Sequence, residues 1–499
     1  MRVSWVISPT VNVFLILTFI VLHCALAGIK NTGESLKTLS GAPVSISALE
    51  ASVSQIMEKA GVTGLSCAII NDSEIVYQKA FGLKNKNSGA RNDEETIFSA
   101  ASFSKTVFAY LVMLLVEEKI IDLDKPLYEY LNQPLHEYPA YEGLKEDGRY
   151  KQMTARMVLS HSTGFPNWRF LTRDGKLNIM FPPGERFNYS GAGIVLLQMV
   201  IEEITGRCLE ELSQEKIFAS LGMTRSSYIW QKEYENNFAL PHDEFERPQR
   251  LSRWQKADAA GSMLTTAGDY ARFLVGILNA KGKRKASIEE MLKPQISITS
   301  ERMFGPGAWE DTDENRALQL SWGLGWGRFN GEHGRAFFHT GHGFGWQNYT
   351  VTYADRGIGI VLLSNSDNFE SVAKEIVERA IGDIHSPFDW LGYIPFDPSR
   401  KKVPPPEPVA IEVNQSILET YVGVYEVMPG EMIFIKFEQD SLFCSSDSAI
   451  WEQMFAESET RFFVKLDNAR FPFLKDAAGM VTGLSLQIQG LELPAKKVK

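Results

Sequence analysis

The chain reads SFSKTVFAYLVMLL from residue 102 to residue 115, which joins a Ser-x-x-Lys pair to a strongly apolar run. Residues three positions apart share one face of a helix, so Lys105 is expected to lie beside Ser102. The apolar residues that follow recur at helical spacing and predict a helix that is buried on most sides. In such a poorly hydrated place the lysine amine loses its proton more readily than in water and can act as a base. The stretch therefore predicts a serine nucleophile at the start of a buried helix.

A Ser-x-x-Lys pair on its own is a weak signal, because short motifs also occur by chance. The same spacing recurs at residues 213–216, inside an amphipathic run, and at residues 399–402, in a charged and proline-rich segment. Neither of these opens a buried helix. The case for Ser102 therefore depends on two further segments, which supply what acyl transfer needs besides a nucleophile.

The first segment reads PPGERFNYSG from residue 182 to residue 191. It places Tyr189 between a turn and a helix expected over residues 194–204, where the phenol would be held at a rigid corner. The second reads FFHTGHGFGW from residue 337 to residue 346 and is interpreted as an edge strand followed by a glycine-rich turn. Small residues there let a substrate lie close to the backbone. Together the segments predict a second proton carrier and a set of backbone donors.

In this order, the three segments resemble the serine hydrolases related to class C β-lactamases, low-molecular-weight penicillin-binding proteins, D-aminopeptidases and family VIII carboxylesterases. Further similar segments, LSHSTGF at 159–165, LGM at 221–223 and GSMLTTAGDY at 261–270, extend the resemblance to residues 45–385. It implies an α/β fold in which a β-lactamase/transpeptidase-like antiparallel sheet is flanked by helices and joined to a helical subdomain. The matching motifs are Ser102 to Lys105, Tyr189-Ser190-Gly191 and His339-Thr340-Gly341.

The resemblance also implies a role for each matched residue. Ser102 would be the acylated nucleophile, with Lys105 and Tyr189 sharing the proton transfers. Which of these two is the working base is left open, because a tyrosine serves as a base only if nearby positive charge favours its phenolate. The oxyanion hole would be formed by the backbone N–H groups of Ser102 and His342, donors worth on the order of 3 kcal/mol each. The implied substrate-binding residues are His339, Thr340 and Gly341.

Two departures from the family pattern bear on the substrate. Gly191 stands where lactamases and peptidases of this family usually carry an asparagine that holds the substrate amide, and Asn188 or Ser190 could take its place. His339 stands in place of a lysine and brings less positive charge to a substrate carboxylate at neutral pH. Both departures lean away from a dedicated β-lactamase.

The function implied is that of a serine hydrolase working through an acyl-enzyme on Ser102. The bond cleaved would be an ester or an amide, the latter in a D-amino-acid peptide or a β-lactam-like compound. The alternative, motivated by Gly191, is a catalytically weak binding or scaffold protein similar to penicillin-binding proteins.

Other side chains near these motifs have structural interpretations. His161 is expected to hydrogen-bond the turn over residues 162–164 rather than to contact a substrate. Phe165, Trp168 and Trp346 either line a pocket or belong to the core, which the sequence leaves open.

Three histidines, His333, His339 and His342, fall within ten residues and raise the question of a zinc site. Their spacing does not support one, because they lie around a strand and its turn, without a His-Glu-x-x-His helix or a nearby cysteine. The sequence therefore predicts neither a metal nor another cofactor.

Composition and the N-terminal residues favour an exported protein. The net charge of −10, without a basic stripe, disfavours nucleic acid as a partner and leaves a small-molecule or peptide substrate. Arg2, an apolar run over residues 11–22 and the sequence Ala25-Leu26-Ala27 predict a signal peptide over residues 1–27. We therefore expect a secreted or periplasmic protein, with an uncleaved membrane anchor as the alternative. The oligomeric state is left open.

The chain is expected to divide into a hydrolase domain over residues 28–390, a proline-rich linker over residues 391–410 and a β-rich domain over residues 411–499. Short β-rich runs separated by turn residues predict a small antiparallel β-barrel in the last of these. A similar lipocalin-like barrel occurs in relatives, and its role here is either structural or substrate-gating. The runs cover residues 421–427, 432–437, 442–445, 461–466, 471–474 and 481–489.

Overall fold

The computed structural model of the protein describes residues 34–172, 175–400, 403–404, 406, 408–428, 431–446, 448, 450–466, 469–488 and 491–499. The predicted signal peptide over residues 1–27 lies outside these ranges. Within them, no helix is both long enough and apolar enough to cross a membrane.

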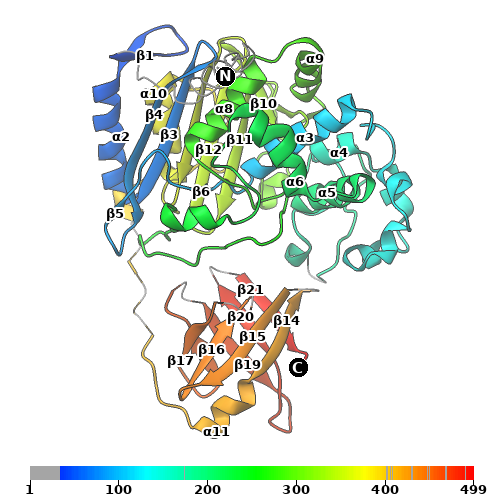
Figure 1. Ribbon diagram of the computed structural model, residues 1–499, viewed down its shortest axis with the longest axis vertical. Helices are drawn as coiled ribbons and strands as arrows, with labels where there is room; N and C mark the ends of the chain where they lie inside the picture. Colours follow the sequence, from blue (N-terminus) through cyan, green and yellow to red (C-terminus); the bar gives the residue numbers. More distant parts are fainter. Residues whose placement is uncertain are drawn as a thin grey trace, which may run out of the picture.

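A nine-stranded sheet, in which neighbouring strands run antiparallel, forms the centre of the larger domain (Figure 1). Its strands β3, β13 and β12 are buried along their whole length, as expected for a sheet that is covered on both faces. This arrangement confirms the predicted antiparallel sheet. In spatial order the strands are β5 (Ala90–Arg91), β4 (Glu74–Asn85), β3 (Gly64–Asn71), β13 (Ile358–Ser364), β12 (Trp346–Tyr353), β11 (Gly334–Gly343), β10 (Gly327–Gly331), β9 (Ser321–Trp322) and β8 (Ile296–Ser297).

Helices cover both faces of this sheet. On one face α2 (Ile46–Ala60) and α10 (Glu370–Ile381) contact each other, and on the other α8 (Ala267–Leu278) packs against β3, β4 and β13. Successive side chains of β3 point to opposite faces of the sheet. Ile69 therefore joins the apolar cluster under α2 and α10, whereas Ile70 joins the cluster under α8. The strands thus supply two cores from one sheet.

The helix predicted after Ser102 is α3 (Phe103–Glu117), and its residues from Phe103 to Leu115 are all buried. It contacts β11 and two shorter helices, α6 (Leu209–Ser213) and α9 (Gly282–Met291). Burial on every side explains why the apolar run is nearly continuous rather than confined to one stripe. The prediction of a buried helix that begins at the serine is confirmed.

A helical subdomain is joined to the sheet beside α3 (Figure 1). Its longest helix, α5 (Gly191–Thr205), begins after Ser190, whose hydroxyl accepts the N–H of Gly193 at 3.0 Å. The remaining elements of the larger domain are β1 (Ser35–Lys37), β2 (Pro43–Ser45), β6 (Phe98–Ser99), β7 (Leu264–Thr265), α4 (Ala155–Leu159), α7 (Ala219–Leu221), the π-helical turn η7 (Gln214–Phe218) and the 3₁₀ turns η2 (Leu127–Tyr130), η3 (Leu135–Glu137), η4 (Pro139–Leu144), η5 (Gly148–Gln152), η6 (Arg169–Leu171), η8 (Lys232–Asn236) and η9 (Pro306–Ala308).

The C-terminal region forms a closed barrel of eight antiparallel strands, which confirms the predicted barrel. Aromatic and aliphatic side chains together form its core, with the rings of Tyr421 and Phe473 stacked 4.0 Å apart. Two strands, β17 and β21, were not predicted. The elements are η10 (Pro398–Arg400), α11 (Gln415–Leu418), η11 (Glu419–Tyr421), β14 (Gly423–Met428), β15 (Glu431–Glu438), β16 (Ser441–Ser445), β17 (Glu452–Ala456), β18 (Arg461–Phe463), β19 (Arg470–Lys475), β20 (Val481–Ile488) and β21 (Leu491–Lys497).

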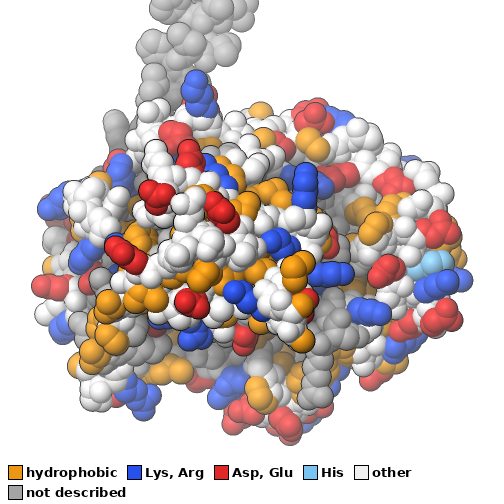
Figure 2. Space-filling model, turned by 90° about the horizontal axis from the view of Figure 1, so that it is seen from below, with side chains coloured by type: hydrophobic (Ala, Val, Ile, Leu, Met, Phe, Trp, Pro, Cys, Tyr) orange, Lys and Arg blue, Asp and Glu red, His pale blue; other side chains and the backbone are white. Residues whose placement is uncertain are grey.

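In Figure 1 the barrel lies below the larger domain. An ion pair between Arg250 and Glu452 on β17 joins the two parts, with 2.5 Å between nitrogen and oxygen. Seen from the barrel side, the Lys and Arg side chains drawn in Figure 2 are interspersed with Asp and Glu rather than gathered in a stripe.

Candidate active site

Ser102 and Lys105 lie at the first turn of α3. The amine of Lys105 donates to the Ser102 hydroxyl at 3.0 Å and to the Ala260 carbonyl at 2.5 Å. Burial lowers the pKa of Lys105 to about 7. The nearby Asp258 carboxylate has the opposite but smaller effect, because its negative charge favours the charged amine and raises the pKa. Near neutral pH a large fraction of the amine is therefore neutral, within hydrogen-bond reach of the serine hydroxyl.

The turn that leads into α3 is held by a second serine. Ala101 has φ 46°, a left-handed conformation that costs a non-glycine residue roughly 1–2 kcal/mol. The hydroxyl of Ser104 donates to the Ala101 carbonyl at 2.6 Å and accepts the N–H of Met263 at 3.0 Å. Ser104 thus fixes this strained turn from inside the protein, whereas Ser102 is half-buried and available to a substrate.

Tyr189 lies just before α5 and shares a hydrogen bond with the side chain of Ser102. Its ring centroid is 5.1 Å from the amine of Lys105. Burial raises the pKa of Tyr189 above its usual range, and the hydrogen bond with Ser102 offsets only part of that rise. The phenol consequently keeps its proton near neutral pH. The structure thus brings together the three residues predicted to share the chemistry.

His161 supports Tyr189 in a way that the sequence did not predict. Its ring centroid lies 4.3 Å from that of Tyr189, and its Nδ1 accepts the N–H of Ser190 at 3.2 Å instead of bonding the turn over residues 162–164. Burial lowers the pKa of His161 well below its usual value, so the ring is neutral and can accept this hydrogen bond. The LSHSTGF segment singles out His161 in the sequence but does not indicate that its hydrogen-bond partner is Ser190.

The third motif lies on β11, which is an interior strand rather than the predicted edge strand. It pairs with β10 from Gly334 to Phe338 and with β12 from Ala336 to Gly343. Its second half therefore has one edge that β10 leaves unpaired. A side chain at Gly341 would lie 2.6 Å from the carbonyl oxygen of Ala100, so the glycine lets β11 approach the segment before Ser102 closely.

These residues face a cavity of about 1030 Å³. Trp168 and Trp346 line it, whereas Phe165 is buried in the core, which resolves the alternatives left open by the sequence. Arg250, the residue paired with Glu452 of the barrel, also lines the cavity. The barrel thus contacts a segment of the cavity wall. The other large apolar side chains of the wall include Phe170, Trp254, Phe304, Phe344, Phe388 and Tyr393.

The structure separates the residues of the third motif. Thr340 and His342 line the cavity, whereas His339 and Gly341 are not among its lining residues. The His339 ring is fully buried, 5.6 Å from the ring of Trp322. Burial, reinforced by the charge of Lys105, lowers the pKa of His339 to about 3. His339 is therefore a neutral core residue on β11, and it brings no positive charge to a substrate.

Trp168 occupies the space that a side chain at position 191 would need. A Cβ atom on Gly191 would lie 2.6 Å from two ring carbons of Trp168. Neither residue expected to replace the missing carboxamide lines the cavity, because Ser190 caps α5 and Asn188 donates to a backbone carbonyl at 2.8 Å. A carboxamide is nevertheless present, since Asn167 lines the cavity and its Oδ1 accepts the Gly191 N–H at 3.0 Å.

Gly191→Ala is expected to lower the free energy of unfolding by about 1–3 kcal/mol, because the new methyl group overlaps the Trp168 ring. Urea denaturation measures the change. Gly148→Ala is the matched control, since a Cβ atom there meets nothing within 4 Å. In a Trp168→Ala background the Gly191→Ala cost should largely vanish. Equal effects of the two glycine substitutions would contradict the account.

Comparisons with known proteins agree with this geometry. The sequence model of the family described as Beta-lactamase matches residues 49–382, and one described as Domain of unknown function (DUF3471) matches residues 407–497. Penicillin-binding protein 4* of Bacillus subtilis is 23% identical over 445 residues, which cover 81% of this chain and 89% of that protein. Esterase EstB of Burkholderia gladioli is 25% identical over 230 residues, covering 41% of this chain and 56% of that protein.

Solved structures show the same fold. The octameric penicillin-binding protein homologue from Pyrococcus abyssi superposes with a TM-score of 0.54 at 23% identity, covering 90% of this chain and all (100%) of that one. The D-alanine carboxypeptidase AmpC from Burkholderia cenocepacia gives 0.51 at 18% identity, covering 66% and 97%. Because the Beta-lactamase model spans well over half of the sequence, the chain belongs to the Beta-lactamase family of serine hydrolases.

Proposed function

We propose that the protein hydrolyses uncharged esters with apolar acyl groups through an acyl-enzyme on Ser102, with Lys105 as the base. The choice of base is supported by the contrast between a buried amine with a pKa of about 7 and a phenol whose pKa is raised. The similarity to an esterase and to penicillin-binding proteins supports the reaction class.

The proposed steps assign one role to each residue of the site. Lys105 accepts the Ser102 proton as the serine oxygen attacks the ester carbonyl, and the backbone N–H groups of Ser102 and His342 receive the oxyanion. The proton then passes through the Tyr189 hydroxyl to the leaving alcohol. Water enters, gives a proton to Lys105 and attacks the acyl carbon. Lys105 returns that proton to the Ser102 oxygen as the bond to the acyl group breaks, which releases the acid and restores Ser102.

The observation that carries the preference for uncharged substrates is the neutral, buried His339. A cation at this position of β11 would favour a substrate carboxylate, whereas this ring supplies none at neutral pH and lies outside the cavity lining. The aromatic wall of the cavity suits an apolar acyl group. The Trp168 ring also fills the space that a side chain at position 191 would need, so no side chain there can bind a substrate amide.

A pair of substrates that differ in the charge at the C-terminus tests this preference. An N-acylated D-Ala-D-Ala peptide with a free carboxylate is compared with its C-terminal carboxamide, which adds no ester bond, alongside p-nitrophenyl butyrate. We expect the highest kcat/KM for the butyrate and a lower value for the free acid than for its carboxamide. A preference for the free carboxylate would overturn the proposed substrate class while leaving the serine chemistry intact.

The pH profile of kcat/KM should report the lysine. The neutral amine is the active form, so kcat/KM for an ester is expected to rise with pH through a midpoint near 7. A pH-stat follows the reaction, because p-nitrophenol itself titrates in this range. A profile that stays flat from pH 6 to pH 8, roughly one unit either side of the midpoint, would argue against Lys105 as the base.

We also propose that the protein acts outside the cytoplasm, on the basis of the signal sequence over residues 1–27. An exported protein whose N-terminus begins at Gly28 would support this, and full-length protein retained in the cytoplasm would contradict it.

The alternative of a catalytically weak binding protein rests on Gly191. It predicts a stable covalent penicillin adduct without turnover of any of the three substrates above.

A further inference from the structure

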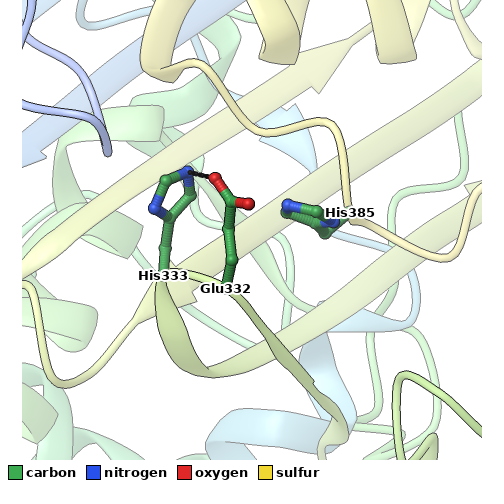
Figure 3. A group of neighbouring side chains, drawn as sticks. All are labelled: Glu332, His333 and His385. Carbon is green, nitrogen blue, oxygen red and sulfur yellow. Dashed lines mark ion pairs between the residues drawn. The ribbon is translucent and has the colours of Figure 1, made fainter.

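Two histidines and a carboxylate meet at the end of the sheet remote from the serine. Glu332 and His333 are the two loop residues of the tight hairpin between β10 and β11, where Gly331 pairs with Gly334. His385 lies in the segment after α10. In Figure 3 the carboxylate of Glu332 lies between the two imidazole rings. One ligand atom from each residue lies within 4.8 Å of the others.

The backbone on both sides of this cluster is held in place. The hairpin loop has only two residues, which leaves it little conformational freedom. On the other side, the Asp383 carboxylate accepts the N–H of His385 at 2.8 Å and the hydroxyl of Tyr353 on β12 at 2.7 Å. Gly331 leaves room for the imidazole, since a Cβ atom there would be 3.3 Å from three atoms of His385. The cluster therefore rests on fixed elements.

The Nε2 atoms of the two histidines are positioned to act as metal ligands. Nε2 of His385 is buried and has no hydrogen-bond partner in the described part of the chain, which is unusual for a polar atom. Nε2 of His333 is 3.4 Å from Oε1 of Glu332, close to the separation of about 3.4 Å between ligands of a tetrahedral zinc ion. The Glu332 side chain is 69% exposed, whereas that of His333 is 13% exposed. The carboxylate can therefore rotate to close the site, and a metal ion can enter from solvent.

We propose that Glu332, His333 and His385 bind one divalent first-row transition-metal ion, with Zn²⁺ as the best match. Imidazole and carboxylate donors suit Zn²⁺ and its neighbours, and are poor ligands as a set for Mg²⁺ or Ca²⁺, which prefer oxygen. Water would complete the coordination. The Arg356 guanidinium, in the turn between β12 and β13, donates to the His333 carbonyl at 3.2 Å and places a positive charge beside the hairpin.

This site is separate from the serine chemistry. His333 precedes β11, and Thr340 lies seven residues further along that strand, a span of roughly 24 Å at 3.4 Å per residue. The ion would join the β10–β11 hairpin to the segment after α10, 52 residues away in the chain. Its effect is therefore expected on stability, because a ligand that binds the folded state alone raises that state's stability.

Titration of tag-free, metal-stripped protein with Zn²⁺ tests the proposal, with calorimetry for stoichiometry and Co²⁺ absorption for geometry. We expect one ion per chain, a rise in Tm on binding, and visible Co²⁺ bands typical of tetrahedral coordination. His385→Ala should weaken binding by about 100-fold or more, and Glu332→Gln by about tenfold or more. His136→Ala, which alters a histidine packed on Tyr150 elsewhere, is the control and should bind as the unmodified protein does.

Two results would overturn the site. One is the absence of a stoichiometric binding event in the unmodified protein, and the other is equal Zn²⁺ affinity in all variants. If His385→Ala does not fold, His385→Gln and the exposed Glu332→Gln provide the same comparison. Ester hydrolysis by Glu332→Gln should match that of the unmodified protein, so the test does not depend on the proposed function.

Discussion

Ser102→Ala is expected to reduce kcat for p-nitrophenyl butyrate by about 10⁴-fold or more. The substitution removes the oxygen that attacks the ester, and no other hydroxyl replaces it, since Ser104 points away into hydrogen bonds with Ala101 and Met263. Because Ser102 is half-buried beside the cavity, the free energy of unfolding should change by less than about 1 kcal/mol. Steady-state kinetics and urea denaturation measure the two effects.

Ser104→Ala is the matched control from the same helix. It leaves the buried N–H of Met263 without its acceptor, so it should lower the free energy of unfolding by about 1–3 kcal/mol. The folded fraction of Ser104→Ala should still hydrolyse p-nitrophenyl butyrate at a measurable rate. If Ser102→Ala kept its activity while Ser104→Ala lost it, the nucleophile would be wrongly assigned.

Lys105→Ala and Tyr189→Phe are each expected to lower kcat by about 10³-fold, and the double variant should lose little more. Both residues bond the Ser102 side chain, so they serve one proton path and their effects cannot add. Phenylalanine keeps the ring that packs 4.3 Å from His161, which separates the loss of the hydroxyl from a loss of packing.

A double variant whose loss equals the product of the two single losses would contradict a shared path. The Tyr189 hydroxyl and the Lys105 amine would then act independently of each other. The folding of each variant is checked by its Tm. This control is needed because Lys105→Ala also removes the hydrogen bond of 2.5 Å that the amine donates to the Ala260 carbonyl.

Local features of the site could be predicted from sequence, because they depend on residues close together in the chain. The i, i+3 spacing of Ser102 and Lys105 fixes their contact once α3 forms. The apolar run over residues 107–115 fixes the burial of that helix and, through it, the lowered pKa of Lys105. The barrel was likewise expected from its short β-rich runs separated by turn residues.

The features that were missed depend on contacts between distant segments. That Trp168 fills the space over Gly191, and that His161 bonds Ser190, follow from how two loops meet and leave no periodic trace. The edge-strand prediction failed because β10 pairs with five residues of β11, which the sequence of β11 does not encode.

Two barrel strands were missed for a local reason. β17 begins with the polar pair Glu452 and Gln453, and β21 contains Pro494 and two lysines; Glu, Pro and Lys are all depleted in strands. Barrel closure supplies partners on both sides of these segments, and this overrides their weak propensity.

The most direct test of the central claim is to label the protein with a fluorophosphonate and locate the adduct by peptide mass spectrometry. The account predicts one adduct per chain, on the hydroxyl of Ser102, with no labelling of Ser102→Ala and much slower labelling of Lys105→Ala. An adduct on another serine, or labelling that persists unchanged in Ser102→Ala, would contradict the claim that Ser102 is the nucleophile.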